Sequence, residues 1–193
     1  MENDKTLLRI KTLTELHGAP GFEEEVRDYM KKEMTPFVDE VITTHMGSVF
    51  GIKKSKKQNA KRVMVAAHMD EIGFMITNIT QNGMLQFTNL GGVSNDIWQG
   101  QRLQVKNRNG EKIVGVVSNI PKHFRTGNEA VPEIKDLMLD IGAESDKEVR
   151  SRGIEIGDTI VPFTPFTQLS EHRYSAKAWD NRYGCVLAIE ILE

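Results

Sequence analysis

A short apolar run that ends in a histidine constrains the fold of this chain more than any other feature. Residues Val63 to Ala67 are all apolar, and His68 and Asp70 follow closely. An apolar run of this length bounded by polar residues predicts a fully buried strand. In α/β sheets, such strands present ligands at their carboxyl ends. The run therefore predicts an α/β layer with a polar site just beyond its last residue.

The residues before this run predict helices followed by strands. Apolar residues at helical spacing predict a helix from Leu7 to Leu16, which Gly18-Ala19-Pro20-Gly21 ends. A second amphipathic helix is expected from about Phe22 until Pro36. Two short strands are expected at Glu40–Thr44 and Ser48–Ile52. This order suits one layer of an α/β domain.

The pattern changes after Asp70 to short strands separated by turn signals. Asn-Gly pairs, as in Gln81-Asn82-Gly83, predict hairpins. Only Asp146–Ser151 has a helical pattern in this stretch. We expect a small β-barrel or sandwich inserted into the α/β layer. Residues 71–167 would form this insert, and residues 1–70 with 168–193 would form an incomplete α/β catalytic domain.

The last part of the chain returns to the α/β pattern. A strand at Arg173–Ala178 is expected to lead to Asp180, and a helix from about Asn181 to follow it. The helical pattern reaches Glu193 without a glycine or proline cap. An uncapped apolar helix at this place predicts an incomplete fold.

Composition excludes several classes of partner and location. The formal net charge is −2, which argues against a surface for nucleic acid or anionic membranes. The basic run Lys53–Lys57 lacks aromatic residues, so we expect a solvated loop. No stretch approaches the ~20 apolar residues that span a bilayer, and the amino terminus does not resemble a signal peptide. A single cysteine, Cys185, suits a reducing compartment, so a soluble cytoplasmic protein is expected.

His68, Asp70 and Asp180 are the candidate site residues. Side chains at i and i+2 of an extended chain share a face, so Asp70 can orient the His68 ring as a carboxylate does behind a metal-bound histidine. Asp180 lies where a predicted strand gives way to a helix and is a second candidate ligand. Glu71 faces the opposite way and is not expected to bind metal. Two alternatives stay open: a structural role for His68 and helix N-capping by Asp180.

Several motifs together resemble a known family. These are His68-Met69-Asp70-Glu71-Ile72-Gly73, Leu90-Gly91-Gly92 and Lys177-Ala178-Trp179-Asp180-Asn181-Arg182-Tyr183-Gly184-Cys185. They resemble the two-metal glutamyl or deblocking aminopeptidases, which include tetrahedral aminopeptidases and proteins labelled endoglucanase M or cellulase M. The resemblance implies a mixed-sheet, phosphorylase/hydrolase-like layer interrupted by a PDZ-like β-barrel that serves oligomerisation.

The resemblance also implies roles for the candidate residues. His68 would bind one metal, Asp180 would bridge two, and Asp70 would hold the His68 tautomer and tune catalysis. Two divalent ions, zinc or cobalt, would be roughly 3.5–4 Å apart and would activate the water that attacks the peptide. The family further implies a cis peptide bond between Asp180 and Asn181.

The family pattern includes groups that have no counterpart in this sequence. These are a glutamate general base, two further carboxylate ligands and a late histidine. We therefore expect these 193 residues alone to bind metal weakly and to be inactive. For a full-length protein the resemblance implies short peptide substrates, and a homo-oligomer in which dimers build a larger shell. His123 is an interface candidate.

Two other functions are weighed against the peptidase. The chain could be a non-catalytic fragment or interaction module, which the coding sequence after Glu193 would decide. A glycan hydrolase, suggested by the cellulase label, is a weaker alternative. Glycosidases use two carboxylates that flank the sugar bond, whereas here an aspartate accompanies a histidine.

Overall fold

The computed structural model describes residues 4–118 and 131–193, and the interface candidate His123 lies outside them. The chain divides into two compact units. Unit 1 comprises residues 1–71 and 164–193, and unit 2 comprises residues 72–163. The boundaries expected from the sequence, 70/71 and 167/168, lie near these divisions. The functions assigned to the two parts stay predictions.

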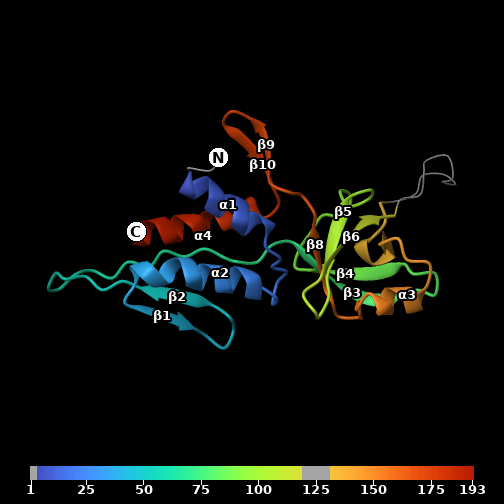
Figure 1. Cartoon of the computed structure of the whole chain (residues 1–193), viewed down its shortest axis with the longest axis horizontal. Helices are drawn as coiled ribbons and strands as arrows, with labels where there is room; N and C mark the ends of the chain where they lie inside the picture. The colour runs from blue at the N-terminus through green and yellow to red at the C-terminus, as the bar shows by residue number, and fades with distance from the viewer. Residues whose placement is uncertain (1–3, 119–130) are drawn as a thin grey trace. The chain divides into compact units, whose positions relative to one another are not determined.

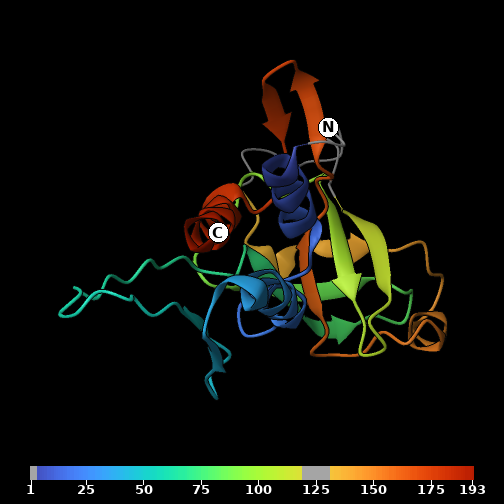
Figure 2. The ribbon, with the colours of Figure 1, turned by 60° about the vertical axis from the view of Figure 1, so that its left-hand side comes forward.

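Unit 1 is built around three helices. They are α1 (Lys5–Glu15), α2 (Glu24–Met34) and α4 (Trp179–Leu192). Each turns an apolar face to a shared core, and α1 and α2 both lie beside α4 in Figures 1 and 2. The core residues are Leu13, Val26, Met30, Met34, Cys185, Val186 and Ile189. The α1 and α2 positions agree with the helices predicted from apolar spacing.

Two antiparallel hairpins complete unit 1. The 3-10 turn η1 (Thr35–Phe37) leads to the first pair, β1 (Glu40–Thr43) with β2 (Val49–Ile52). The second pair is β9 (Thr167–Ser170) with β10 (Arg173–Ser175). In both ribbon views this second hairpin extends away from α1 (Figures 1 and 2). Three of these strands, β1, β2 and β10, fall where strands were expected, and β9 was not predicted.

The apolar run at Val63–Ala67 is not a buried strand, so that prediction is wrong. Val63 and Met64 are 85% and 79% exposed. A buried strand needs neighbours that satisfy its backbone groups and cover its faces. Among the residues that the structure describes, none forms a ladder with this run. The mixed sheet expected around it stays a prediction, since the described strands of unit 1 form only the two antiparallel pairs.

Unit 2 is a closed barrel of six strands, which confirms the barrel expected from the turn signals. The strands follow one another around it in the order β3-β4-β7-β6-β5-β8. They are β3 (Gly73–Ile79), β4 (Leu85–Leu90), β5 (Arg102–Lys106), β6 (Lys112–Val117), β7 (Met138–Asp140) and β8 (Thr159–Pro162). The turn η3 (Ile134–Asp136) and the helix α3 (Asp146–Ser151) lie between strands. The predicted Asn82-Gly83 turn joins β3 to β4, with Gly83 at a φ of +81°.

Aromatic residues fill the barrel interior. Phe74 contacts Phe87 and Trp98 edge-to-face, with ring centroids 5.3 and 4.8 Å apart. Such pairs add about 0.5–1.5 kcal/mol each to the burial of the rings. Trp98 therefore serves packing, and unit 2 has a core of its own.

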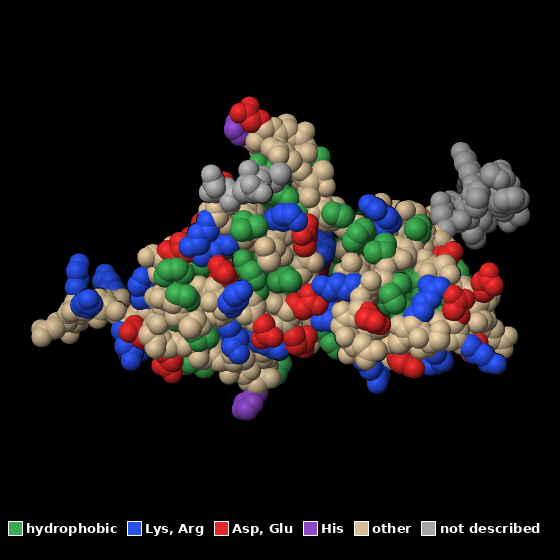
Figure 3. Space-filling view, viewed as in Figure 1, with side chains coloured by type: hydrophobic (Ala, Val, Ile, Leu, Met, Phe, Trp, Pro, Cys, Tyr) green, Lys and Arg blue, Asp and Glu red, His purple; other side chains and the backbone are tan. Residues whose placement is uncertain are grey.

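The surface agrees with the charge pattern of the sequence. Lysine and arginine side chains gather on the segment that follows β2 (Figure 3). Residues 53–66 in this segment are exposed, which confirms a solvated loop. Within the described residues, no helix is both long and apolar enough to cross a bilayer.

Candidate metal site

His68 lies between two carboxylates in unit 1. Its Nδ1 is 2.7 Å from Asp70 Oδ1, and its Nε2 is 3.0 Å from Asp180 Oδ1. Asp70 is two residues further along the same segment, whereas Asp180 is 112 residues away at the start of α4. The structure thus brings together all three residues that sequence analysis selected.

The backbone around Asp180 differs from that of an ordinary helix start. Ala178 has a left-handed conformation (φ 56°, ψ 24°), and Asp180 and Asn181 have non-helical dihedrals. The peptide bond between Asp180 and Asn181 is cis, as the family resemblance implied. These dihedrals break the first turn, so the regular part of α4 begins after Asn181. Within the described residues, the Asp180 carboxylate contacts His68 Nε2 and accepts no hydrogen bond from a helix N–H, so the N-capping alternative finds no support there.

The three side chains are open to solvent. Asp180 is 90% exposed, and His68 and Asp70 are 51% and 39% exposed. Partial burial lowers the pKa of His68, but the hydrogen bonds and charges of Asp180 and Asp70 outweigh it and raise the pKa above its usual value. In the absence of metal the ring therefore keeps its second proton to a higher pH than an ordinary histidine, and in that protonated form it can donate to both carboxylates. A cation that binds Nε2 must displace this proton.

The donor set fits a divalent metal. An imidazole nitrogen and a carboxylate oxygen are both zinc ligands, and a carboxylate on the other ring nitrogen is the usual partner of a metal-bound histidine. His68 and Asp180 can supply the first two groups and Asp70 the third. Among the described residues, no group of three or more His, Cys, Asp or Glu side chains could hold an ion. The described residues thus offer a pair of ligands and an orienting carboxylate.

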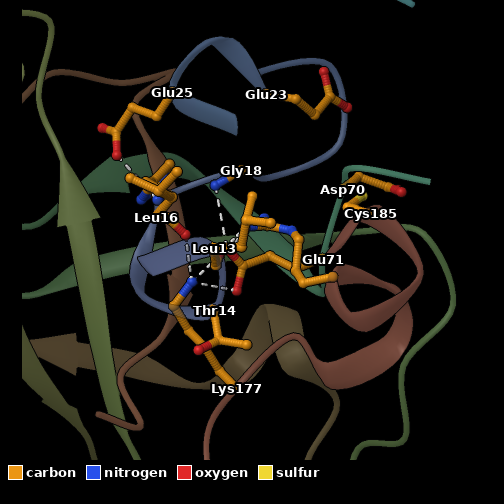
Figure 4. A network of polar contacts seen from close by, with 12 residues as sticks. Leu13, Thr14, Leu16, Gly18, Glu23, Glu25, Asp70, Glu71, Lys177 and Cys185 are labelled. Atoms are coloured by element: carbon orange, nitrogen blue, oxygen red, sulfur yellow. Dashed lines mark hydrogen bonds and ion pairs between the residues drawn. The ribbon is translucent and has the colours of Figure 1, made fainter. Parts of the chain in front are cut away.

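A buried cluster of charges lies behind this site. Glu71, Lys177 and Arg182, called the ion cluster below, have side chains that are 2%, 7% and 0% exposed. In Figure 4 the carboxylates of Asp70 and Glu71 point in different directions, and Glu71 meets Lys177. Sequence analysis placed Glu71 on the opposite face from Asp70 but did not pair it. The available signal was its place directly after Asp70, because successive side chains of an extended segment point to opposite sides.

Cys185 lies beside the site without taking part in it. Its Sγ is 3.3 Å from the His68 carbonyl oxygen, to which the thiol donates, and it is 1% exposed. Burial raises the pKa of the thiol to about 11 from an ordinary value of 9.0. Cys185 therefore serves as a small buried apolar residue of the helical core.

Cys185 is expected to resist alkylation in the folded protein. The raised pKa lowers the thiolate fraction at pH 8 by about 100-fold, and the thiolate is the reactive form. Iodoacetamide labelling followed by mass spectrometry should be at least 100-fold slower in buffer than in denaturant. Labelling at the rate of a free thiol in the folded protein would show that the packing of α1 and α2 against α4 does not cover Cys185.

Comparison with known proteins decides the family. A sequence profile described as M42 glutamyl aminopeptidase matches residues 47–193. The chain belongs to this family. The match spans His68, Asp70 and Asp180 and confirms the resemblance drawn from the motifs. Among curated M42 relatives, a glutamyl aminopeptidase from Lactococcus lactis subsp. cremoris is 40% identical over 190 residues, which make up 96% of this chain and 53% of that protein.

Solved structures of M42-like aminopeptidases share the fold of this chain. Aminopeptidase APDkam598 from Desulfurococcus kamchatkensis superposes with a TM-score of 0.91 at 36% identity, over 97% of this chain and 51% of that one. A Pyrococcus horikoshii TET1 peptidase, described as able to form a tetrahedron or a large octahedral shell, gives a TM-score of 0.81 at 29% identity, over 96% of this chain and 55% of that one. This chain spans about half the length of the relatives it matches.

Proposed function

We propose that this chain is part of a metal-dependent aminopeptidase that removes amino-terminal residues from short peptides. The observation that carries the proposal is the His68 ring held between Asp70 and Asp180. Membership of the M42 family supports peptide hydrolysis as the reaction. Aminopeptidase is also the activity named for the relative from Lactococcus lactis.

In this proposal the three residues have separate roles. His68 Nε2 and the Asp180 carboxylate would hold the metal, and Asp180 would be shared by two divalent ions, zinc or cobalt. Asp70 accepts a hydrogen bond from the Nδ1–H of His68, which keeps the proton on Nδ1 and leaves the Nε2 lone pair for the metal. Bound divalent ions would supply an activated water and polarise the peptide carbonyl. Asp180, at 90% exposure, remains accessible to an ion from solvent.

Metal binding by the described residues alone should be weak. Structural zinc sites have four protein ligands, and catalytic zinc sites have three and a water. The described residues supply two. The proposal therefore concerns the native polypeptide that carries residues 1–193. Activity is to be measured on that polypeptide, purified from its host.

The replacement Asp70→Asn tests the orienting role. We expect kcat/KM on leucyl- and glutamyl-p-nitroanilide to fall about 10–100-fold, the range found when the outer partner of a metal-bound histidine is replaced. The neutral amide no longer favours the Nδ1–H tautomer of His68. Asp28→Asn, on the exposed side of α2, is the matched control and should leave activity unchanged. Unaltered activity in Asp70→Asn, or hydrolysis that survives removal of metal by a chelator, would contradict the proposal.

Assembly and location extend the proposal. The likeness to the TET1 peptidase supports a homo-oligomer in which dimers build a larger shell. The free, buried Cys185 is consistent with a cytoplasmic location. Mass measurement of the native assembly and cell fractionation test these two points.

A non-catalytic interaction module is the second candidate. It is favoured by one observation, that the described residues hold no group of three or more metal-binding side chains. Such a module would leave the native polypeptide without peptidase activity at any zinc or cobalt concentration. The aminopeptidase proposal predicts metal-dependent turnover in the same assay.

A further inference from the structure

The ion cluster lies within three residues of each candidate ligand along the chain. Glu71 directly follows Asp70, and Lys177 and Arg182 flank Asp180 on either side. The cluster therefore joins the two segments that carry His68 and Asp180. These segments are distant in the sequence and come together in unit 1.

The contacts within the cluster are close and almost fully buried. Lys177 Nζ is 2.6 and 2.7 Å from the two carboxylate oxygens of Glu71. Arg182 Nη2 is 3.3 Å from Glu71 Oε1. One carboxylate thus receives two cations, one from each side of the Asp180 segment. Burial raises the pKa of Glu71 while both cations act against that shift.

A third segment, the chain just after α1, closes the cluster. The Gly18 N–H donates to Glu71 Oε1 at 3.1 Å, and the Glu71 N–H donates to the Gly18 carbonyl at 3.0 Å. Lys177 Nζ donates to the Leu16 carbonyl at 2.7 Å, and Arg182 donates to the Leu13 carbonyl. A Cβ on Gly18 would lie 2.5 Å from Arg182 Nη2, so any side chain at this position would displace the buried guanidinium. Three segments therefore meet at one carboxylate.

The candidate ligands are too exposed to be fixed by packing of their own. His68 and Asp180 are 51% and 90% exposed, so their positions depend on the backbone that carries them. In an extended segment successive side chains point to opposite sides. Asp70 can thus face His68 while Glu71, its neighbour, fixes the same backbone from the interior.

Buried ion pairs contribute little net stability, because desolvation offsets much of their attraction. Their directional contacts can instead select one arrangement of the segments that they join. Functional groups must lie within about 0.5 Å of the productive geometry, and residues behind them supply that order. A cluster that joins both ligand-bearing segments is placed to do this.

We propose that the ion cluster positions His68 against Asp180 before any metal binds. Glu71, Lys177 and Arg182 are positioning residues in this inference, and they touch neither metal nor substrate. The metal-binding part of the inference rests on the proposed function. The geometric part, the 3.0 Å approach of His68 Nε2 to Asp180 Oδ1, does not.

Lys177→Met tests the inference with limited damage to charge balance. The variant leaves Glu71 opposite Arg182, so that one carboxylate still faces one cation. Arg9→Met is the matched control, because Arg9 is also a buried cation of unit 1 (3% exposed) and pairs with Glu33 and Glu193 away from the site. Melting temperatures of both variants give the purely structural effect.

Mn²⁺ affinity is the first readout, measured from the paramagnetic broadening of His68 ring signals in NMR spectra. We expect Lys177→Met to weaken Mn²⁺ binding at least 10-fold, as outer-shell changes do. The Mn²⁺ affinity of Arg9→Met should stay within 2-fold of that of the unaltered chain, even if its melting temperature falls as much as that of Lys177→Met. Equal weakening in both variants, or none in Lys177→Met, would overturn the positioning role.

The metal-free spectra give a second readout that does not depend on the proposed function. The ¹⁵N shifts of the His68 ring report its contacts with Asp70 and Asp180. Lys177→Met should move the Nε2 signal, and Arg9→Met should not. If the unaltered native polypeptide binds no Mn²⁺, the metal site fails while these shifts still decide the positioning role. Should Lys177→Met not fold, Lys177→Gln, which keeps a donor toward Glu71, is measured with the same expected results.

Discussion

Glu71→Leu is expected to lower the free energy of unfolding of unit 1 by about 3–5 kcal/mol, the cost of removing one partner from a buried ion pair. The replacement leaves Lys177 and Arg182, at 7% and 0% exposure, without the carboxylate that both contact. It also removes an acceptor from the Gly18 N–H. Urea unfolding followed by far-UV circular dichroism measures the change.

The control for this prediction breaks an exposed ion pair in the same unit. Lys11 and Glu15 are 44% and 38% exposed and lie one turn apart on α1. Lys11→Met should therefore cost less than about 0.5 kcal/mol. A Glu71→Leu loss as small as this would show that the ion cluster is solvated and not buried.

His68→Ala is expected to reduce kcat/KM of the native polypeptide by more than the ~100-fold upper range for outer-shell replacements, because it removes a metal ligand and not its partner. Asp180→Ala should lower kcat/KM at least as much, because the Asp180 carboxylate would bind both metals in the proposed site. Both side chains are more than half exposed, so stability should change little. Activity on leucyl-p-nitroanilide and melting temperature are measured together.

His172 offers the matched control for the histidine. It lies in the exposed turn between β9 and β10, where its ring is 78% exposed. His172→Ala should retain full activity and stability. Loss of activity in both histidine variants, or in neither, would contradict a specific role for His68.

The helices and the barrel could be predicted from the sequence because local patterns determine them. Helical spacing of apolar residues gave α1 and α2, and the Asn82-Gly83 turn signal gave the hairpin of β3 and β4. These features depend on neighbours within a few residues. They need no knowledge of what packs against them.

The run at Val63–Ala67 could not be assigned correctly because burial of a strand depends on distant partners. Its apolar composition is compatible with a sheet interior, yet Val63 is 85% exposed. Hydrophobic periodicity shows which side chains of a segment are apolar. It does not show whether another element packs over them. The position of His68 therefore does not follow from a strand end. It follows from the packing of Ala67 and Met69 against the helical core and from the contacts of Glu71.

The candidate site residues could be predicted from the sequence, but the ion cluster behind them could not. The i+2 spacing of His68 and Asp70 predicted their hydrogen bond, which the structure contains at 2.7 Å. The meeting of Glu71 with Lys177 involves residues 106 positions apart, and no spacing rule links them. Long-range ion pairs of this kind become visible only in three dimensions.

Paramagnetic NMR with Mn²⁺ at pH 8 tests most directly whether His68 and Asp180 bind metal. A basic pH is chosen because the pKa of His68 is raised and its protonation competes with metal for Nε2. Substoichiometric Mn²⁺ should broaden the His68 ring signals and the backbone signals of Asp180 and Asn181 first. The effect should disappear in His68→Ala and in Asp180→Asn. Broadening that leaves His68 sharp, or that persists unchanged in both variants, would contradict the metal site.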